Sequence, residues 1–198
     1  MTRLVLASRS AARLSLLRGA GVPVEAADAG VDEGPLKDRL VAEGRSPLEV
    51  AKALATAKAL AASEQRPDAV IIAADQTLDL HGRLLDKPVD LEAAAQRLRD
   101  LRNTTHSLHS SVVLAVNQTV LWEHVDSPRL TFRDFSDAEL DRQLASEGEA
   151  LLSSVGAYRL EGPGVRLLAA MTGDYFSILG LPLLPLLAEL RNRELIPE

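Results

Sequence analysis

The stretch DAVIIAAD, from Asp68 to Asp75, decides the fold class of this chain. Its inner residues, Ala69–Ala74, are all apolar, and an acid stands at each end. A continuous apolar run of this length is typical of a central strand that is covered on both faces. The pattern therefore places Ala69–Ala74 in the middle of a sheet, with Asp75 where the predicted strand ends.

Strands and helices alternate on both sides of this central strand, and neighbouring strands are common in the middle of the chain. The predicted strands are Arg3–Ala7, Val22–Ala26, Thr77–Leu80, Arg83–Leu85, a pair around Asn117-Gln118, and Arg129–Arg133. The predicted helices start after Ser10 and after Ser136 and cover Pro47–Ala62, Leu91–Leu101 and Pro182–Arg193, with a loop at Gly30–Gly34. These elements predict an α/β fold built on a mixed twisted sheet with flanking helices. Since no repeat or Gly/Ser linker marks a boundary, we expect one domain over residues 1–198.

Composition excludes several classes of protein. The chain has 198 residues, 22 basic and 28 acidic side chains, a net charge of −6, 3% aromatic residues and no cysteine. The negative charge and scarce aromatics argue against a nucleic-acid partner, and the missing thiols exclude disulfides and thiolate metal sites. The most apolar run, Ile178–Leu190, is too short to span a bilayer and contains two prolines, so we expect no membrane partner, a buried strand end followed by a helix, and a cytoplasmic location.

The corner after the first strand is the first candidate for ligand binding. A helix N-terminus offers free backbone N–H groups that suit phosphate, and Ser8, Ser10 and Arg13 add hydroxyl and guanidinium donors. The alternative is a helix cap at Ser10 beside surface arginines. No phosphate-binding loop, dinucleotide fingerprint or nucleophile elbow is present elsewhere.

Charged residues at other positions complete the inventory. Asp75 suits a metal ligand or a general base, or it ends the strand as a turn residue. Lys58, between Ala57 and Ala59 of the long helix, either extends its ammonium to the solvent or points into a cleft, while Lys87 follows the hairpin. Glu33, in the loop, is a second carboxylate for Mg²⁺ or an ordinary solvated acid. Taken together, these groups suit metal-assisted attack of water on a polyphosphate.

The order of these motifs resembles the Maf family of nucleoside triphosphate pyrophosphatases. The motifs LASRSAARLSLL, VDE, ALATAKA, AADQ, LDKP, GAYRLEG and GDYFSILGLPL occur in the family's order from Leu4 to about Leu187. The resemblance implies two lobes around a central cleft, a fold similar to the inosine triphosphate pyrophosphatases, and hydrolysis of a nucleoside triphosphate to the monophosphate and pyrophosphate. It also implies a divalent cation such as Mg²⁺ or Mn²⁺.

The resemblance assigns roles residue by residue. Asp75 matches the family's catalytic proton acceptor, either as general base or as metal ligand, and Glu33 matches a carboxylate near the metal. The groups that match the phosphate side are Ser8, Arg13, Lys58 and Lys87.

Two further positions indicate the substrate. Gln76 and Glu161 are similar to the branch that acts on 7-methyl-GTP, in place of the Thr and Gln of the dTTP/UTP branch. A carboxylate at Glu161 would accept from the guanine edge and complement a positively charged methylated purine. Ala11 and Ala12 depart from both branches, and so leave one fewer ring or cation beside the nucleotide.

Two alternatives stay open on the sequence alone. The chain could prefer dTTP or UTP, or it could bind nucleotide without turnover as an inhibitor of septum formation, since the family is linked to cell division. The resemblance and the apolar C-terminal run suggest a homodimer.

Overall fold

The computed structural model describes residues 3–197. Its backbone contacts divide the chain into two compact units, and each unit is described here by itself. The first contains the residues up to Gln76, His109–Ser127, and Asp174 onward, while the second contains Thr77–Leu108 and Pro128–Gly173. Both units are therefore assembled from separated stretches of sequence, and the prediction of one domain over residues 1–198 stays a prediction.

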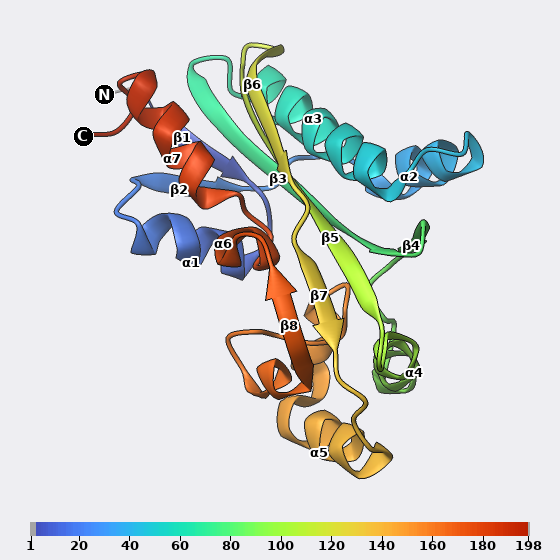
Figure 1. Cartoon of the computed structure of the whole chain (residues 1–198). Helices are drawn as coiled ribbons and strands as arrows, with labels where there is room; N and C mark the ends of the chain where they lie inside the picture. Colours follow the sequence, from blue (N-terminus) through green and yellow to red (C-terminus); the bar gives the residue numbers. More distant parts are fainter. Residues whose placement is uncertain (1–2, 198) are drawn as a thin grey trace. The chain divides into compact units, whose positions relative to one another are not determined.

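The first unit contains most of the sheet and the longest helix (Figure 1). Its elements are β1 Arg3–Ala7, α1 Ala11–Gly19, β2 Val24–Ala27, α2 Glu33–Ala42, α3 Pro47–Gln65, the start of β3 Ala69–Leu80, most of β5 Thr105–Val116, β6 Thr119–Asp126, α6 Tyr175–Ile178 and α7 Leu183–Asn192. Strand β1 lies between β2 and β3 and is parallel to both, with Leu4 opposite Val24 on one side and Val70 on the other. Strands β5 and β6 are antiparallel. The expected mixed sheet with flanking helices is confirmed.

Helices cover both faces of the sheet in this unit (Figure 1). Because side chains alternate along a strand, the two faces collect different residues. The core under α1 and α7 contains Leu4, Leu6, Leu17, Ile72, Leu114, Leu183, Leu186 and Leu190. The core under α3 contains Val5, Ala7, Ala55, Ala59, Ile71, Ala73 and Val113. Strand β3 is thus covered on both faces, as its apolar run predicts.

Two predicted boundaries are wrong. Strand β3 continues through Asp75 and Gln76 to Leu80, so Asp75 lies inside a strand and does not end it. An acid is tolerated there because a buried lysine pairs with it, as described below. The expected strand end at Ile178 is instead the short helix α6, which begins after Asp174 because the Asp174 carboxylate caps it by accepting from the Ser177 N–H.

The loop predicted at Gly30–Gly34 is also wrong, because helix α2 begins within it. Asp32 is the N-cap, and its carboxylate accepts from the N–H of Gly34. Helix α2 has no buried residue, and its apolar stripe consists of little more than Leu36 and Leu40, which is too short to predict a helix. Glu33 is consequently the first residue of a helix.

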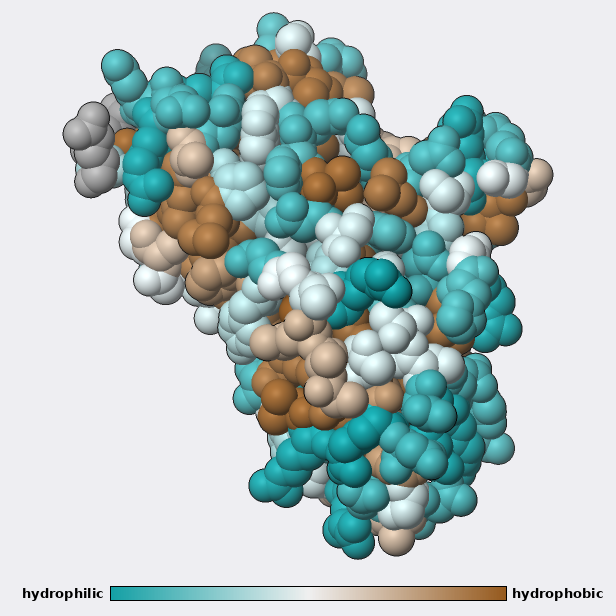
Figure 2. Space-filling model, viewed as in Figure 1, coloured by the Kyte–Doolittle hydropathy of each residue, from teal (hydrophilic) through white to brown (hydrophobic). Residues whose placement is uncertain are grey.

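The C-terminal apolar run forms helix α7. Its inward side chains enter the core, whereas Leu184 is 57% exposed, and Figure 2 shows hydrophobic residues gathered over this helix. No described helix is long and apolar enough to cross a membrane. The homodimer suggested by this run stays a prediction.

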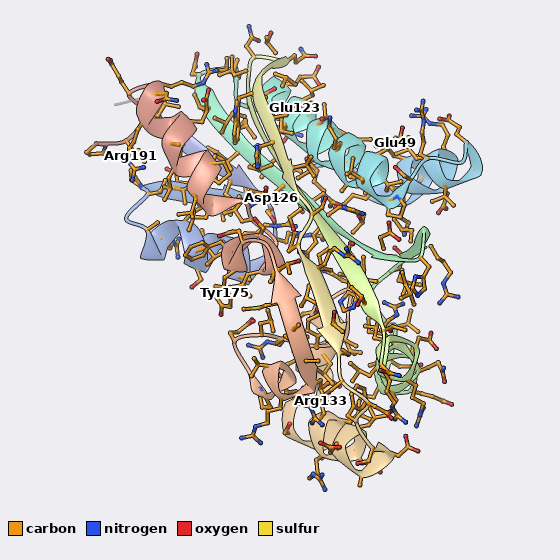
Figure 3. The ribbon with its side chains drawn as sticks, in the orientation of Figure 1. Glu49, Glu123, Asp126, Arg133, Tyr175 and Arg191 are labelled. Atoms are coloured by element: carbon orange, nitrogen blue, oxygen red, sulfur yellow. The ribbon has the colours of Figure 1, made fainter. Side chains whose placement is uncertain are left out.

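The second unit is built on strand ends and two helices. Its elements are the end of β3, β4 Arg83–Leu85, α4 Leu91–Leu101, the start of β5, β7 Arg129–Phe132, α5 Asp137–Glu147, two 3₁₀ helices at Gly148–Ser153 and Pro163–Leu167, and β8 Leu168–Thr172. The predicted hairpin at His81-Gly82 is confirmed: both residues have positive φ, as a tight two-residue turn requires. Strand β7 pairs with β5 and β8, and Arg133 at its end (Figure 3) binds Glu139 of α5.

Aromatic rings form the centre of the second unit. The His106 ring contacts Phe132 and Tyr158 with centroids 5.3 and 5.6 Å apart, and Phe132 also contacts Phe135. His106 Nε2 and the Tyr158 hydroxyl share a hydrogen bond of 2.8 Å. His106 is buried, and this burial lowers its pKa to about 4.

This buried histidine makes the stability of the fold depend on pH. In the folded chain His106 binds a proton only near pH 4, whereas in the unfolded chain it does so near its ordinary pKa of 6.5. The contribution of the neutral ring is fully present above about pH 6.5 and is lost as the pH falls toward 4, by up to about 3 kcal/mol. Urea unfolding at pH 7.5, 6.0 and 4.5 should show a shallower pH dependence in His106→Gln than in the wild type.

The exposed turn residue His81 supplies the control, as His81→Asn should keep the wild-type pH dependence. If the free energy of unfolding depends equally on pH in the wild type and in His106→Gln, the buried His106 ring is not the source of the pH dependence.

Candidate active site

The alternation of β3 places Asp75 on the face covered by α3. Ile71 and Ala73 belong to the core under that helix, and Asp75 follows them at the same two-residue spacing. On α3, buried Ala51, Ala55 and Ala59 form the facing stripe, and buried Lys58 lies in the same stripe. Small alanines let the helix pack closely on the strand, so the lysine chain reaches the carboxylate.

Lys58 joins two carboxylates. Its Nζ lies 2.6 Å from Oδ1 of Asp75 and 2.8 Å from Oε2 of Glu33, the first residue of α2. Lys58 and Asp75 are each 8% exposed, while Glu33 is half-buried. The structure therefore brings together three of the residues that the sequence predicted for the site, from α2, α3 and β3.

Electrostatics at Asp75 combine two opposed effects. Burial raises the pKa of Asp75, and the charges of Lys58 and Arg13 oppose that rise. For Arg13 itself, burial lowers the pKa while the two carboxylates support its charge. Two acids and two bases thus share one buried region, where charges interact more strongly than in water.

The donor set suits a divalent cation that completes its shell elsewhere. The carboxylates of Glu33 and Asp75 converge on one cationic point, the Lys58 ammonium. Mg²⁺ commonly takes one or two protein carboxylates and obtains its other ligands from water and substrate phosphates. Among residues 3–197 no group of three or more Asp, Glu or His side chains forms a metal site, so a protein-only cage is absent from the described part of the chain. The residues fit a metal that arrives with a phosphate.

Arg13 holds backbone as well as facing the site. Its Nη1 donates to the carbonyl of Ala74 (2.8 Å) and to Oγ of Ser8 (3.3 Å), and its Nε donates to the carbonyl of Gly180 (2.8 Å). A Cβ at position 180 would make ordinary van der Waals contact with this guanidinium, but Gly180 has φ +97°, a conformation that favours glycine. Arg13 thereby fixes the strand residue that precedes Asp75.

Ser8 and Ser10 form the predicted corner at the start of α1. Ser10 is the N-cap, accepting from the N–H of Arg13, and the Ser10 N–H donates to Oγ of Ser8 at 3.2 Å. The cap at Ser10 is confirmed, but the surface arginines of that alternative are wrong for Arg13, which is buried. The phosphate role of Ser8 stays a prediction.

Gln76 points to the opposite face of β3 from Asp75. Its Nε2 donates to Oγ of Ser110 (2.8 Å) and to the carbonyls of Ser177 and Ile178 (both 3.1 Å). Because carbonyl oxygens only accept, the nitrogen must face them, which leaves Oε1 as the amide's remaining polar atom. Gln76 therefore binds the α6 segment to the strand, and any ligand contact it makes would be as an acceptor.

Sequence reasoning missed the residues that support Gln76. Ser110 Oγ donates to the carbonyl of Ser177 at 2.6 Å, and Ser177 Oγ donates to Asp126 Oδ2 at 2.6 Å. Asp126, labelled in Figure 3, also binds His124 Nε2 at 2.9 Å. Ser177 lies within the motif GDYFSILGLPL, but no motif marks Ser110, Asp126 or His124. The signal that could have found Ser110 is its parity on β5 with core residues Val112 and Leu114.

Lys87 and Glu161 belong to the second unit. Lys87 is exposed just after β4, and the neighbouring Asp86 carbonyl accepts from Arg97 Nη1 at 2.8 Å. Glu161 is exposed, with its Oε1 3.4 Å from Nε of Arg159. Their roles toward a nucleotide stay predictions.

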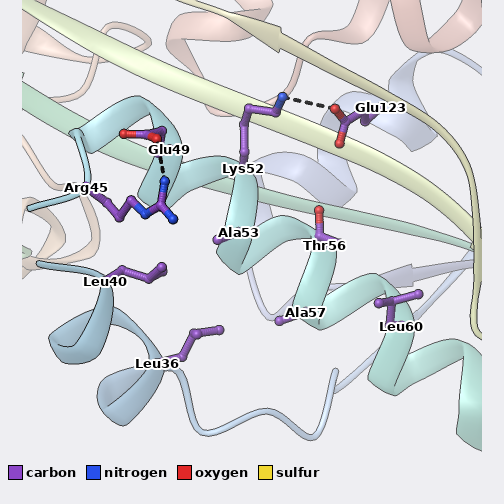
Figure 4. Close-up of a pocket in the computed structure, with 10 residues that line it drawn as sticks. All are labelled: Leu36, Leu40, Arg45, Glu49, Lys52, Ala53, Thr56, Ala57, Leu60 and Glu123. Carbon is purple, nitrogen blue, oxygen red and sulfur yellow. Dashed lines mark hydrogen bonds and ion pairs between the residues drawn. The ribbon is translucent and has the colours of Figure 1, made fainter. Parts of the chain in front are cut away.

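A groove of about 550 Å³ lies elsewhere in the first unit, between α2 and α3 (Figure 4). Leu36 and Leu40 of α2 face Ala53 and Ala57 of α3 across it. The charges at its rim are paired, Arg45 with Glu49 at 3.1 Å and Lys52 with Glu123 at 3.0 Å. Lys58 and Asp75 are not among its lining residues, so the reactive charges lie outside this groove.

A family model described as Maf-like protein matches residues 3–193. A nucleoside triphosphate pyrophosphatase of Granulibacter bethesdensis is 52% identical, with 97% of this chain and 98% of that protein covered. A 7-methyl-GTP pyrophosphatase of Rhizobium meliloti is 49% identical over 96% and 95%, and one of Brucella suis is 47% identical over 98% of each. A solved HAM1 protein from Coxiella burnetii matches with a TM-score of 0.41 and 16% identity, covering 68% of this chain and 75% of that one.

The buried ion pair between Lys58 and Asp75 should stabilise the fold, because without it a buried charge would have no partner. Lys58→Met leaves the buried Asp75 carboxylate without its cation, which we expect to lower the free energy of unfolding by about 3 kcal/mol. The double variant Lys58→Met/Asp75→Asn should recover most of that loss because the buried carboxylate is no longer charged, while Glu33, which also loses Lys58, is partly exposed to water. Urea unfolding at pH 7.5 measures both.

Lys52→Met is the matched control on the same helix. Lys52 pairs with Glu123 at the surface, so its loss should cost less than about 1 kcal/mol. A Lys58→Met effect as small as that of Lys52→Met would show that the buried pair does not carry the predicted stability.

Proposed function

Since the chain belongs to the Maf-like protein family, we propose that it hydrolyses a nucleoside triphosphate to the monophosphate and pyrophosphate. The observation that carries this proposal is the buried Asp75–Lys58–Glu33 group, which joins an acid that can take a proton to a cation that can face phosphate. Full-length similarity to pyrophosphatases supports the same hydrolase class.

The reaction joins water to the α-phosphorus and breaks the bond from that phosphorus to the α–β bridging oxygen. Lys58 binds Oδ1 of Asp75, so Oδ2 is the oxygen we assign to orient the attacking water and accept its proton. Pyrophosphate leaves with the bridging oxygen. Because the phosphate oxygens gain charge as this bond breaks, the fixed cation at Lys58 stabilises the transition state more than the substrate.

We propose a divalent cation, Mg²⁺ or Mn²⁺, as cofactor, held by Glu33 and Asp75. When bound, it would neutralise phosphate oxygens as a Lewis acid. Lys58 would stay paired with the two carboxylates and would add its charge to the phosphate side of the proposed site. Ser8, Arg13 and Lys87 remain the other phosphate-side groups of the proposal.

We propose 7-methyl-GTP, or a nucleotide modified in the same way, as the substrate, so that the enzyme limits incorporation of such a nucleotide into nucleic acids. Relatives named 7-methyl-GTP pyrophosphatase, 46–49% identical over nearly the whole chain, support this choice. Glu161 supplies the carboxylate that complements a cationic base, and Gln76 Oε1 is an acceptor. A cytoplasmic location, a homodimeric assembly and the absence of a nucleic-acid partner stay predictions from the sequence.

Pyrophosphate release is the direct test of this function. With Mg²⁺ or Mn²⁺, the wild type should release pyrophosphate, and Asp75→Asn should lower kcat about 10²- to 10⁴-fold because the proton acceptor is lost. EDTA should abolish release, and added Mg²⁺ or Mn²⁺ should restore it. Asp68→Asn, at the exposed position before β3, should keep wild-type activity.

Nucleotide binding without release would contradict the enzyme proposal. It would favour the alternative, a nucleotide-binding inhibitor of septum formation. A rise in melting temperature with nucleotide, measured in parallel, distinguishes binding from inactivity.

Base preference is tested by comparing kcat/KM across 7-methyl-GTP, GTP, dTTP, UTP, CTP and ATP. We expect 7-methyl-GTP to be preferred, and Glu161→Gln to reduce its advantage over GTP about tenfold because a charge complementary to the cationic base is removed. Glu92→Gln, at an exposed acid of α4, should leave the preference unchanged. Preference for dTTP or UTP would favour the other branch and overturn the assignment of Glu161.

A further inference from the structure

Glu147, the last residue of α5, carries a buried carboxylate that the proposed reaction does not use. Its side chain is only 4% exposed, and Gln143 Nε2 donates to its Oε2. The Gly164 N–H also donates to this carboxylate, while burial raises the pKa of Glu147. A buried acid that accepts several hydrogen bonds holds the neighbouring segments in place.

The segment around Glu147 is the turn that carries Glu161. Gly162 and Gly164 let the chain close on the carboxylate: a Cβ at position 162 would lie 2.7 Å from Glu147 Oε1, and one at position 164 would lie 2.7 Å from the Arg159 carbonyl. Neither position therefore tolerates a side chain without a shift. Glu147 thus fixes the path of residues 159–164.

One guanidinium lies between two acids at this turn. Arg159 Nη1 is 3.8 Å from Oε1 of Glu147, and Arg159 Nε is 3.4 Å from Oε1 of Glu161. The three charges sum to −1. Arg159 Nε donates a hydrogen bond to Glu161, whereas its contact with Glu147 is an ion pair alone. The guanidinium is therefore shared between the two acids, and Glu161, which is exposed, keeps part of its charge for the solvent side.

We propose that Glu147 and Arg159 are positioning residues that set the charge and direction of Glu161, and so set how strongly the chain prefers a cationic 7-methylated purine nucleotide to its neutral counterpart. This inference rests on the role proposed above for Glu161. Removing the charge of Glu147 releases Arg159 to pair fully with Glu161 and neutralise it. Removing Arg159 leaves Glu161 with its full charge.

Binding of the product nucleotides tests this without requiring turnover. Isothermal titration calorimetry gives Kd for 7-methyl-GMP and for GMP, and the preference is their ratio. Glu147→Gln should lower the preference for 7-methyl-GMP about fivefold, whereas Arg159→Gln should raise it about two- to fivefold. Opposite directions are the signature of charge control, since damage to the fold would weaken both ligands alike.

The double variant tests whether Glu147 acts through Arg159. In the Arg159→Gln background, adding Glu147→Gln should change the preference by less than twofold. Asp141→Asn, which removes an exposed acid of the same helix, should leave the preference at its wild-type value. Arg159 is partly exposed, so its variant keeps the test available even where Glu147→Gln lowers the melting temperature.

Each other outcome overturns the inference in a distinguishable way. If Glu161→Gln lowers the preference and Glu147→Gln does not, Glu161 recognises the base and the positioning role fails. If Glu161→Gln has no effect, the recognition role fails and the inference with it. Pyrophosphate release is measured separately, so the loss of either role leaves the proposed hydrolysis to its own test.

Discussion

The two-residue repeat of a strand buried on both faces is the constraint on which the candidate site depends. Along β3 the side chains of Ile71, Ala73 and Asp75 enter the α3 face, and Gln76 enters the other. Consecutive residues therefore serve different purposes: Asp75 meets a buried lysine, while Gln76 ties down the α6 segment. A shift of one residue in register would exchange these environments, placing a carboxylate against backbone carbonyls that could not donate to it.

The buried charges explain why the sequence predicted the residues better than the boundaries. Apolar runs and N-caps correctly predicted β1, α1, α3, α4 and α5. The pattern ends the strand too early because the polar residues Asp75 and Gln76 are the ordinary sign of a strand end. In the structure Lys58, 17 positions away in sequence, neutralises Asp75 inside the strand. Sequence pattern shows polarity at a position but not the partner that makes it tolerable, because that partner is brought close by tertiary packing.

Helix α2 and Glu147 were missed for complementary reasons. Helix α2 has no buried residue, and apart from the short pair Leu36 and Leu40 its signal is the Asp32 cap, which also fits a turn. Glu147 ends an amphipathic helix, where a solvated acid is the ordinary expectation, yet its side chain is almost fully buried. In both cases the decisive information is what the rest of the chain places over the segment. That coverage depends on contacts between distant residues and leaves no periodic mark on the local sequence.

Residues that attract notice as ligand donors also hold the site together. Arg13 directs two donors at backbone carbonyls, and Gln76 directs its nitrogen at two more, so neither side chain can swing freely toward a phosphate or a base. Rigid placement of this kind lowers the reorganisation needed when charge develops, which is where a preorganised site gains over water. The same logic distinguishes the two acids of the Arg159 turn. The Glu147 side chain is only 4% exposed and so has few alternative partners, whereas Glu161, although it accepts from Arg159, is exposed where a ligand can meet it. One shared guanidinium can therefore transmit the state of the buried acid to the exposed one, because any strengthening of either ion pair weakens the other.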